Sequence, residues 1–189
     1  MVIDGSGHAV IISGDSGNDS GPGGLGNVRA FNIAAGSSVT LSHLNIVSGT
    51  HNTDGGGIYN AGDLKVLHST IADNTSGVNG GGIRNLGTLV LRNSTLSGNA
   101  AQYGGGINST GVLELYNSTL SGNTGNEGAG GGIRQWDGAL RLYNTILANS
   151  GADGDCRVSD SNVILANVHN LVEDGWCSAG GVGFMSGDP

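Results

Sequence analysis

The sequence predicts an all-β fold, a right-handed parallel β-helix (a solenoid) with about 25 residues per coil. Three observations support this fold class. The tetrapeptide Gly-Gly-Gly-Ile recurs at nearly constant spacing, each copy leads into a Leu-x-Leu-like segment, and glycine accounts for 38 of the 189 residues. A helix would not tolerate this glycine content, because each glycine costs about 1 kcal/mol relative to alanine.

The repeat sets the length of one coil. Gly-Gly-Gly-Ile begins at Gly55, Gly80, Gly104 and Gly130, so the steps between successive copies are nearly equal, about 25 residues each. The segments that follow have apolar residues at alternate positions, which is typical of short strands with one buried face. These segments are 64–71, 89–96, 113–120 and 140–147, with a weaker early copy at 39–46 and a degraded one at 162–165.

In a parallel solenoid each strand pairs with its equivalent one coil on, about 4.8 Å away. Equivalent apolar residues therefore form stacks, and these stacks make up the predicted core. The predicted stacks are Ile58, Ile83, Ile107 and Ile133; Val66, Leu91, Leu115 and Leu142; and Ile46, Ile71, Leu96, Leu120 and Leu147.

A polar residue occurs at the same place in every repeat, two positions after the second apolar residue of the Leu-x-Leu segment. We expect these side chains to form a structural ladder at an inward turn, where they satisfy backbone groups that would otherwise be buried without partners. The predicted ladder consists of His43, His68, Asn93, Asn117 and Asn144. The glycine triplets predict tight bends with positive φ and close approach of successive coils.

The charge balance excludes several classes of partner. Lysine plus arginine is 7 and aspartate plus glutamate is 15, a formal net charge of -8. No basic stripe is present to displace counterions from nucleic acid, and an acidic chain is not attracted to an anionic membrane surface. No apolar run approaches the roughly 18 residues that span a bilayer, so we expect no membrane insertion by this segment.

Cys156 and Cys177 are the two cysteines, and both follow the last regular repeat. We predict that they form a disulfide that pins a cap, because the end of a solenoid exposes open strand edges. Free thiols and a metal site remain alternatives, although zinc needs more ligands and only His169 lies nearby. A stable disulfide indicates an oxidising compartment.

The predicted organisation is β-helix coils over 1–154, with regular coils over about 30–150, and an irregular capping segment over 155–189. We expect Trp176 and Phe184 to close the end of the core.

Outward-facing columns carry the candidate carbohydrate-binding residues. Three of them directly follow the second apolar residue of a Leu-x-Leu segment, where two tyrosines beside an arginine could hold a sugar ring face-on. The other three directly follow the isoleucine of a Gly-Gly-Gly-Ile tetrapeptide. The alternative is that exposed aromatic residues are simply strand formers. The six candidates are Tyr59, Arg84, Arg92, Tyr116, Arg134 and Tyr143.

The repeats also support a resemblance. The run from Ile3-Asp4-Gly5-Ser6-Gly7 through the Gly-Gly-Gly-Ile and Asn-Ser-Thr-Leu-Ser-Gly-Asn repeats resembles bacterial extracellular right-handed β-helix proteins. These belong to the pectin-lyase-like superfamily, in the group with CSLREA and choice-of-anchor domains, and are akin to polymorphic outer-membrane repeats. The tail, with Gly154-Asp155-Cys156 and Asp174-Gly175-Trp176-Cys177, is similar as well. The resemblance implies an extracellular or bacterial cell-surface location, and a fragment or truncated form of a longer protein.

We therefore expect a secreted or cell-surface structural or adhesive module without catalytic activity. The alternatives are a polysaccharide lyase or glycoside hydrolase of the same fold, or a carbohydrate-binding module. Enzymes of the superfamily use a calcium-binding acidic cluster with a basic residue, or several aspartates on adjacent coils. Within the repeats no two aspartates share equivalent or adjacent columns, and lysine occurs once, at Lys65.

We expect no cofactor and no metal, apart from weak Ca²⁺ binding at Asp153-Gly154-Asp155 and Asp160. The expected partner is a polysaccharide or a cell-surface glycan. Open ends would also allow end-to-end self-association of the solenoid.

Overall fold

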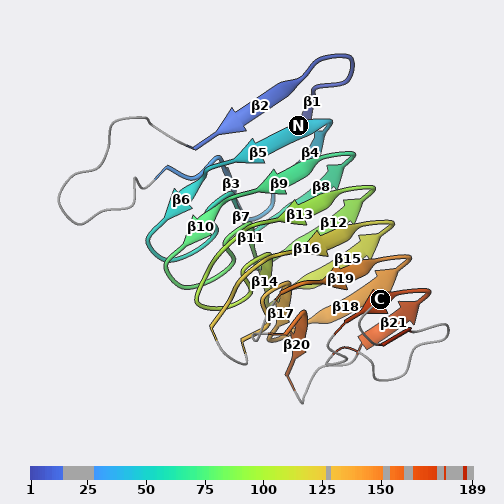
Figure 1. Cartoon of the computed structure of the whole chain (residues 1–189). Coiled ribbons are helices and arrows are strands. Elements are labelled where there is room, and N and C mark those ends of the chain that lie inside the picture. Colours follow the sequence, from blue (N-terminus) through green and yellow to red (C-terminus); the bar gives the residue numbers. More distant parts are fainter. Residues whose placement is uncertain are drawn as a thin grey trace.

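The computed structural model is a parallel β-solenoid, in which the chain winds through successive coils along one axis (Figure 1). It describes residues 1–14, 28–126, 129–150, 154–159, 164–173, 177 and 185–186. Neighbouring strands pair in parallel, and no helix is present in these ranges. The predicted fold class is confirmed.

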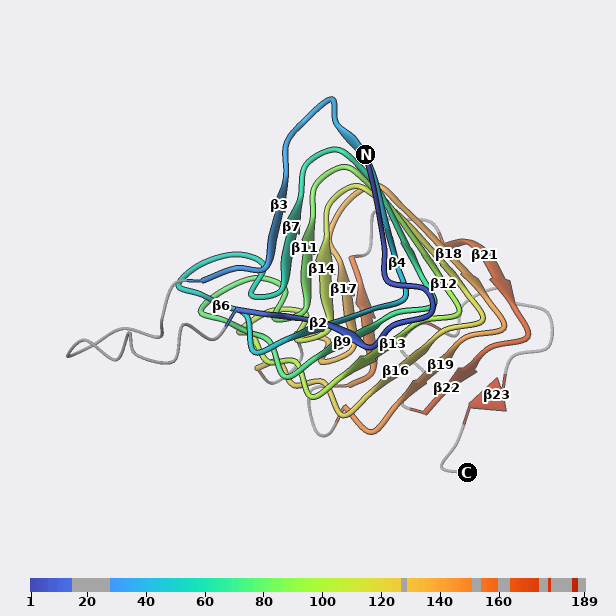
Figure 2. The ribbon, with the colours of Figure 1, turned by 90° about the horizontal axis from the view of Figure 1, so that it is seen from above.

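Three long sheets form the walls, and Figure 2 shows them as the three sides of a roughly triangular cross-section. Sheet A contains, in order, β1 (Val2–Asp4), β4 (Ser38–Ser42), β8 (Asp63–Leu67), β12 (Thr88–Arg92), β15 (Val112–Tyr116), β18 (Ala139–Tyr143) and β21 (Ile164–Val168). Sheet B contains β2 (Val10–Ser13), β5 (Leu44–Val47), β9 (Thr70–Ala72), β13 (Thr95–Ser97), β16 (Thr119–Ser121), β19 (Ile146–Ala148), β22 (Leu171–Val172) and β23 (Met185–Ser186). Sheet C contains β3 (Phe31–Ile33), β7 (Ile58–Asn60), β11 (Ile83–Asn85), β14 (Ile107–Ser109), β17 (Ile133–Gln135) and β20 (Cys156–Val158). A short sheet D pairs β6 (Thr50–His51) with β10 (Thr75–Ser76).

Equivalent residues of successive repeats pair in register. In sheet A, Val90 pairs with Lys65 of the preceding coil on one side and with Glu114 of the following coil on the other. Within one coil the chain runs from sheet C to sheet A, then to sheet B, and returns to sheet C through the loop that carries the glycine triplet. One full turn therefore corresponds to one sequence repeat, and the predicted coil length is confirmed.

The core is a set of aliphatic columns. Ile83 of sheet C, Leu91 of sheet A and Leu96 of sheet B are each 0% exposed, as are their equivalents in the next coil. The three predicted stacks are all present in one continuous cluster. Because each fully buried aliphatic side chain contributes about 2 kcal/mol, these columns provide the main driving force for winding the chain.

The polar column of His43, His68, Asn93, Asn117 and Asn144 lies at the corner between sheets A and B, and it is exposed. The prediction that it faces inward is therefore wrong. Each of these residues has a positive φ, a left-handed conformation that Asn and His adopt more readily than most side chains. The repeat thus keeps Asn or His here because the corner needs this backbone conformation. The side chains still contact each other, and Asn117 donates to Asn93 at 3.2 Å.

Buried ladders occupy other positions of the repeat. Asn74, Asn99 and Asn123, which follow sheet B in successive coils, are 0% exposed. The Asn99 side-chain amide donates to Asn123 Oδ1 and to the backbone carbonyl of Ile71, each at 2.9 Å, and its own Oδ1 accepts from Asn74. A second ladder, at the corner between sheets A and B, is formed by hydroxyl groups that accept backbone N–H bonds from the preceding coil, as Ser94 does from Ser69 at 3.2 Å.

The glycine triplets have the two roles expected of them. The first glycine of each triplet has a positive φ, +62° at Gly80. The second lies against the next coil, so a Cβ on Gly81 would overlap the backbone carbonyl of Ala100. Neither position accepts a side chain without a shift of the backbone.

The three sheets continue past residue 154. Strand β20 pairs with β17, β21 with β18 and β22 with β19, with a register shift beside Leu140. Cys156 of β20 pairs with Ile133 and so extends the isoleucine column of sheet C.

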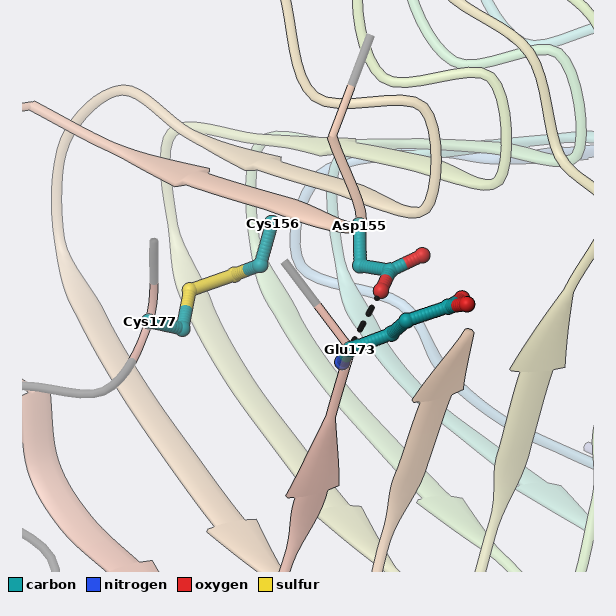
Figure 3. The surroundings of a disulfide bond; sticks show 4 residues. All are labelled: Asp155, Cys156, Glu173 and Cys177. Atoms are coloured by element: carbon teal, nitrogen blue, oxygen red, sulfur yellow. Dashed lines mark hydrogen bonds between the residues drawn. A yellow bond between two sulfur atoms is a disulfide. The ribbon is translucent and has the colours of Figure 1, made fainter. Parts of the chain in front are cut away.

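Cys156 and Cys177 form the predicted disulfide, with Cα atoms 5.6 Å apart (Figure 3). Both residues are buried, and a loop of this length gives about 3 kcal/mol in the chain-entropy estimate. Beside the disulfide, Asp155 accepts backbone N–H bonds from Ser150 and Glu173, each at 3.0 Å. Trp176 and Phe184, the predicted closure of the core, lie outside the described residues.

Candidate ligand-binding surfaces

The six predicted carbohydrate-binding residues divide between two faces of the solenoid. Arg92, Tyr116 and Tyr143 lie in adjacent strands of sheet A, and we call them the tyrosine wall. The other three lie in one column of sheet C. Arg84 pairs with Tyr59 of the preceding coil, and Arg134 lies two coils after Arg84. Figure 2 shows that sheets A and C form two different sides of the triangle, so one ligand ring cannot contact both sets.

The tyrosine wall is a closed stack. The rings of Tyr116 and Tyr143 lie 4.9 Å apart between centroids and 4° from parallel. The Arg92 guanidinium lies 3.7 Å from the centroid of the Tyr116 ring. Because Arg92 and Tyr143 come from the coils on either side of Tyr116, both faces of that ring are covered. A sugar ring therefore has no free face of Tyr116 on which to stack.

Polar contacts fix the wall in place. Tyr116 donates its hydroxyl hydrogen to Glu114 at 3.0 Å, and Arg141 donates to the same carboxylate at 2.9 Å. Burial raises the pKa of Tyr116, and the hydrogen bond to Glu114 and its charge act in the same direction. The phenol thus stays protonated as a donor, and the contacts of this surface are mostly internal.

The outer face of sheet C is different, because it carries a hollow of about 280 Å³. We call it the arginine hollow. Its lining combines two guanidinium groups with aromatic rings and amide groups, and none of the described residues that line it carries a carboxylate. The lining residues are Val78, Asn79, Arg84, Tyr103, Asn108, Thr110, Arg134 and Trp136.

Arg134 is held in the hollow by aromatic rings. Its guanidinium lies 4.0 Å from the ring centroid of Tyr103 and 4.7 Å from that of Trp136. A guanidinium that lies over aromatic rings still has N–H groups that can donate hydrogen bonds in its own plane. Trp136 is 56% exposed, so much of its ring is open to solvent or to a ligand.

Arg84 is held by amides. It donates to Asn108 Oδ1, and Asn108 in turn donates to Asn79 Oδ1 at 3.1 Å. Asn79 donates to Asp54 at 2.7 Å, which links the network to a carboxylate of the preceding coil. These contacts orient the Arg84 side chain within the hollow.

The electrostatics of this face differ from those of the chain as a whole. Four of the 7 basic residues lie on or beside sheet C, namely Arg29, Arg84, Arg134 and Arg157. Burial lowers the pKa of Arg84, and the charge of Asp54 opposes this shift. Burial likewise lowers the pKa of Arg134. Among the described residues, the ion pairs are His43–Asp4 and Arg141–Glu114, so neither arginine of the hollow is within ion-pair distance of a carboxylate.

The sequence-based prediction missed Tyr103 and Trp136. The signal for Trp136 is present in the sequence, because it lies two residues after Arg134 and alternate residues of a strand point to the same side. Tyr103 directly precedes a glycine triplet, at a position that pairs in register with Asn79 of the preceding coil, but no other repeat has an aromatic residue there.

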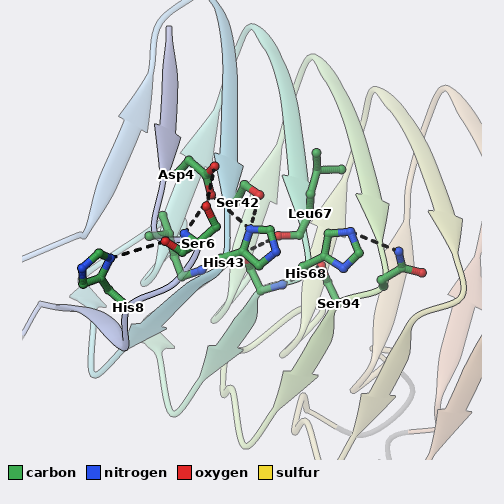
Figure 4. Close-up of polar contacts among 11 residues, drawn as sticks. Asp4, Ser6, His8, Ser42, His43, Leu67, His68 and Ser94 are labelled. Carbon is green, nitrogen blue, oxygen red and sulfur yellow. Dashed lines mark hydrogen bonds and ion pairs between the residues drawn. The ribbon is translucent and has the colours of Figure 1, made fainter.

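A third polar cluster lies at the first corners between sheets A and B (Figure 4). The rings of His43 and His68 stack 5.0 Å apart, and Ser42 Oγ and Asp4 Oδ1 lie 2.7 Å and 3.1 Å from His43 Nδ1. Both oxygens face the same ring nitrogen. A Ser–His–Asp relay needs the serine and the carboxylate on opposite nitrogens, so this geometry does not match one.

No group of three His, Cys, Asp or Glu side chains suited to a metal ion occurs within the described ranges. Of the residues named for weak Ca²⁺ binding, Asp153 and Asp160 lie outside those ranges. Both carboxylate oxygens of Asp155 accept backbone hydrogen bonds.

Comparison with known proteins finds no matching family model, no similar curated protein and no similar solved structure. The part of the chain that the structure describes has no helix long and apolar enough to cross a membrane.

Proposed function

We propose that this chain is an extracellular β-solenoid module that binds glycans without turning them over, and that the arginine hollow is the contact site. The observation that carries the proposal is the hollow itself, an open depression of about 280 Å³ lined by aromatic rings and hydrogen-bond donors on a regular wall. Sugars are bound by such combinations, since a ring stacks against the apolar face while N–H groups meet the hydroxyls.

Two further features support an extracellular role. The disulfide between Cys156 and Cys177 favours an oxidising compartment. The repeats resemble those of bacterial surface β-helix proteins of the pectin-lyase-like superfamily, whose stiff walls suit an adhesive or structural module. We place the contact site on sheet C rather than on the tyrosine wall because Trp136 is open, whereas the faces of Tyr116 are covered.

The test is binding of the full chain to an array of neutral and acidic glycans, followed by titration of the strongest ligand. Trp136→Ala should weaken binding by about tenfold or more, since loss of one stacked ring removes more than about 1 kcal/mol. Tyr143→Ala is the matched control, because it removes an aromatic ring from the other face. If Tyr143→Ala abolishes retention and Trp136→Ala does not, the contact site is the tyrosine wall and our assignment is wrong.

A depolymerisation assay on the retained glycans, with and without Ca²⁺, separates binding from catalysis. New chain ends that increase with time would show a lyase or hydrolase and contradict the noncatalytic part of the proposal. A broad array that retains no glycan would contradict the binding part.

A further inference from the structure

The arginine hollow contains two half-buried positive charges, and the described residues of its lining contribute no negative charge. Arg84 and Arg134 are both partly removed from water, and burial lowers the pKa of each. A guanidinium stays protonated in proteins, so both groups keep their charge. Removing a charge from water is unfavourable unless an opposite charge compensates for it. Asp54, the carboxylate whose charge acts on Arg84, lies beside Asn79 in the preceding coil and is not among the lining residues.

The geometry around the two arginines suits an anion. The Arg134 guanidinium lies over the rings of Tyr103 and Trp136, and Arg84 is oriented by Asn108. Both guanidinium groups are thus ordered before a ligand arrives, which lowers the entropy lost on binding. Planar guanidinium groups with fixed orientation match the in-plane geometry of carboxylate, sulfate and phosphate oxygens.

The size of the hollow suits a small ligand. Sites for drug-sized ligands begin at about 300 Å³, so a hollow of about 280 Å³ has room for one sugar ring with its substituent. The exposed Trp136 ring provides an apolar surface next to Arg134, so a ring bearing a charged group can contact both.

We infer that the arginine hollow selects an oxoanion carried on a sugar ring, that is, a carboxylate, sulfate or phosphate substituent of one glycan residue. This inference rests on the proposed function and names its ligand class. The charged group is bound by Arg84 and Arg134, and the ring lies against Trp136. The chain, with a net charge of -8, thus binds an anion on the one face where arginines gather.

The experiment uses four probes with the same ring: glucose, glucuronate, glucose 6-sulfate and glucose 6-phosphate. Binding to the full chain is measured by calorimetry or ligand-observed NMR at 50 mM and 300 mM NaCl. We expect at least one anionic probe to bind tenfold or more tightly than glucose at low salt, and to lose much of this advantage at high salt. The preferred probe identifies which oxoanion the hollow takes.

The variants are Arg84→Gln and Arg134→Gln, with Arg92→Gln as the matched control. Arg92 also contacts an aromatic ring but lies on sheet A. Either hollow variant should reduce the preference for the anionic probe to within about threefold of glucose, while Arg92→Gln leaves it unchanged. Arg134→Lys, which keeps the charge, should retain part of the preference. Melting temperatures within a few degrees of the wild type show that the variants are folded.

Equal binding of glucose and all three anionic probes overturns the inference but leaves glycan binding at the hollow intact. A loss in Arg92→Gln equal to that in the hollow variants also overturns it, because the effect would then be one of overall charge. If inorganic sulfate binds as tightly as glucose 6-sulfate, the hollow takes a free ion and the role of the ring is wrong.

Discussion

The tyrosine wall and the arginine hollow are built from the same residue types on the same scaffold, yet they differ in what remains open. On sheet A, Arg92, Tyr116 and Tyr143 occupy one column, and each covers its neighbour. On sheet C, Asn108 separates Arg84 from Arg134, and the aromatic rings come from outside that column, from Tyr103 and Trp136. A column of repeated aromatic residues therefore stabilises the solenoid, whereas an interrupted column leaves space for a ligand.

The largest expected effect comes from the buried interior of the solenoid, which supports both surfaces. Asn99→Leu should lower the free energy of unfolding by about 3 kcal/mol, because it leaves the buried partners of a ladder amide unsatisfied. Chemical denaturation monitored by circular dichroism measures this. The matched control is Asn117→Leu at the exposed corner, where the cost should be about 1 kcal/mol from the left-handed backbone. Equal costs for the two variants would contradict the distinction between buried and exposed columns.

A smaller effect separates the two surfaces directly. Tyr116→Ala should lower the free energy of unfolding by about 1–2 kcal/mol, because it removes a stacked pair and a cation–π contact. Trp136→Ala should change it by less than about 0.5 kcal/mol, since the ring is largely exposed. The same denaturation assay measures both. A greater loss for Trp136→Ala than for Tyr116→Ala would reverse the roles assigned to the two surfaces.

The smallest effect is expected at Asp4. This residue pairs with Ser42 in the first coil of sheet A, in the column that continues into the tyrosine wall. The Ser6 backbone N–H and then His43 hold the pKa of Asp4 below its ordinary value. A carboxyl group whose pKa is lower in the folded than in the unfolded state stabilises the protein at pH values above its unfolded-state pKa. That contribution is lost as the pH falls through its folded-state pKa. Thermal melts between pH 6 and pH 2 should show a shallower loss of stability below about pH 4 in Asp4→Asn than in wild type. Identical profiles would exclude this linkage.

The sequence predicts the strands and the buried apolar columns well because both recur with the repeat. Apolar residues at alternate positions of each repeat fix the strands, and the stacks of Ile83, Leu91 and Leu96 follow from in-register pairing. The disulfide was predictable because two cysteines in a terminal segment have few other roles.

The predicted polar ladder lies one position before the buried hydroxyl ladder and six positions before the buried asparagine ladder. The sequence has Asn-Ser-Thr in two repeats, and periodicity alone does not say whether the asparagine or the serine points inward. The backbone conformation decides, since Asn93 has a left-handed φ and the Ser94 side chain points into the core.

The arginine hollow could not be predicted from the sequence for a related reason. It depends on aromatic side chains at Tyr103 and Trp136, and the equivalent positions of the other coils carry no aromatic residue.

The corner between sheets A and B has a consequence for how such a chain can vary. From sheet A to sheet B the buried residues lie five positions apart in successive coils, as in Leu91 to Leu96, Leu115 to Leu120 and Leu142 to Leu147. The return from sheet B to sheet C is not constant, since the step from Leu120 to Ile133 is longer than the step from Leu96 to Ile107. Insertions are thus accommodated in the loops that reach sheet C, while the opposite corner keeps its length. Duplication of one coil would lengthen the solenoid, and new loop sequences would change the rim of the arginine hollow without disturbing the buried columns.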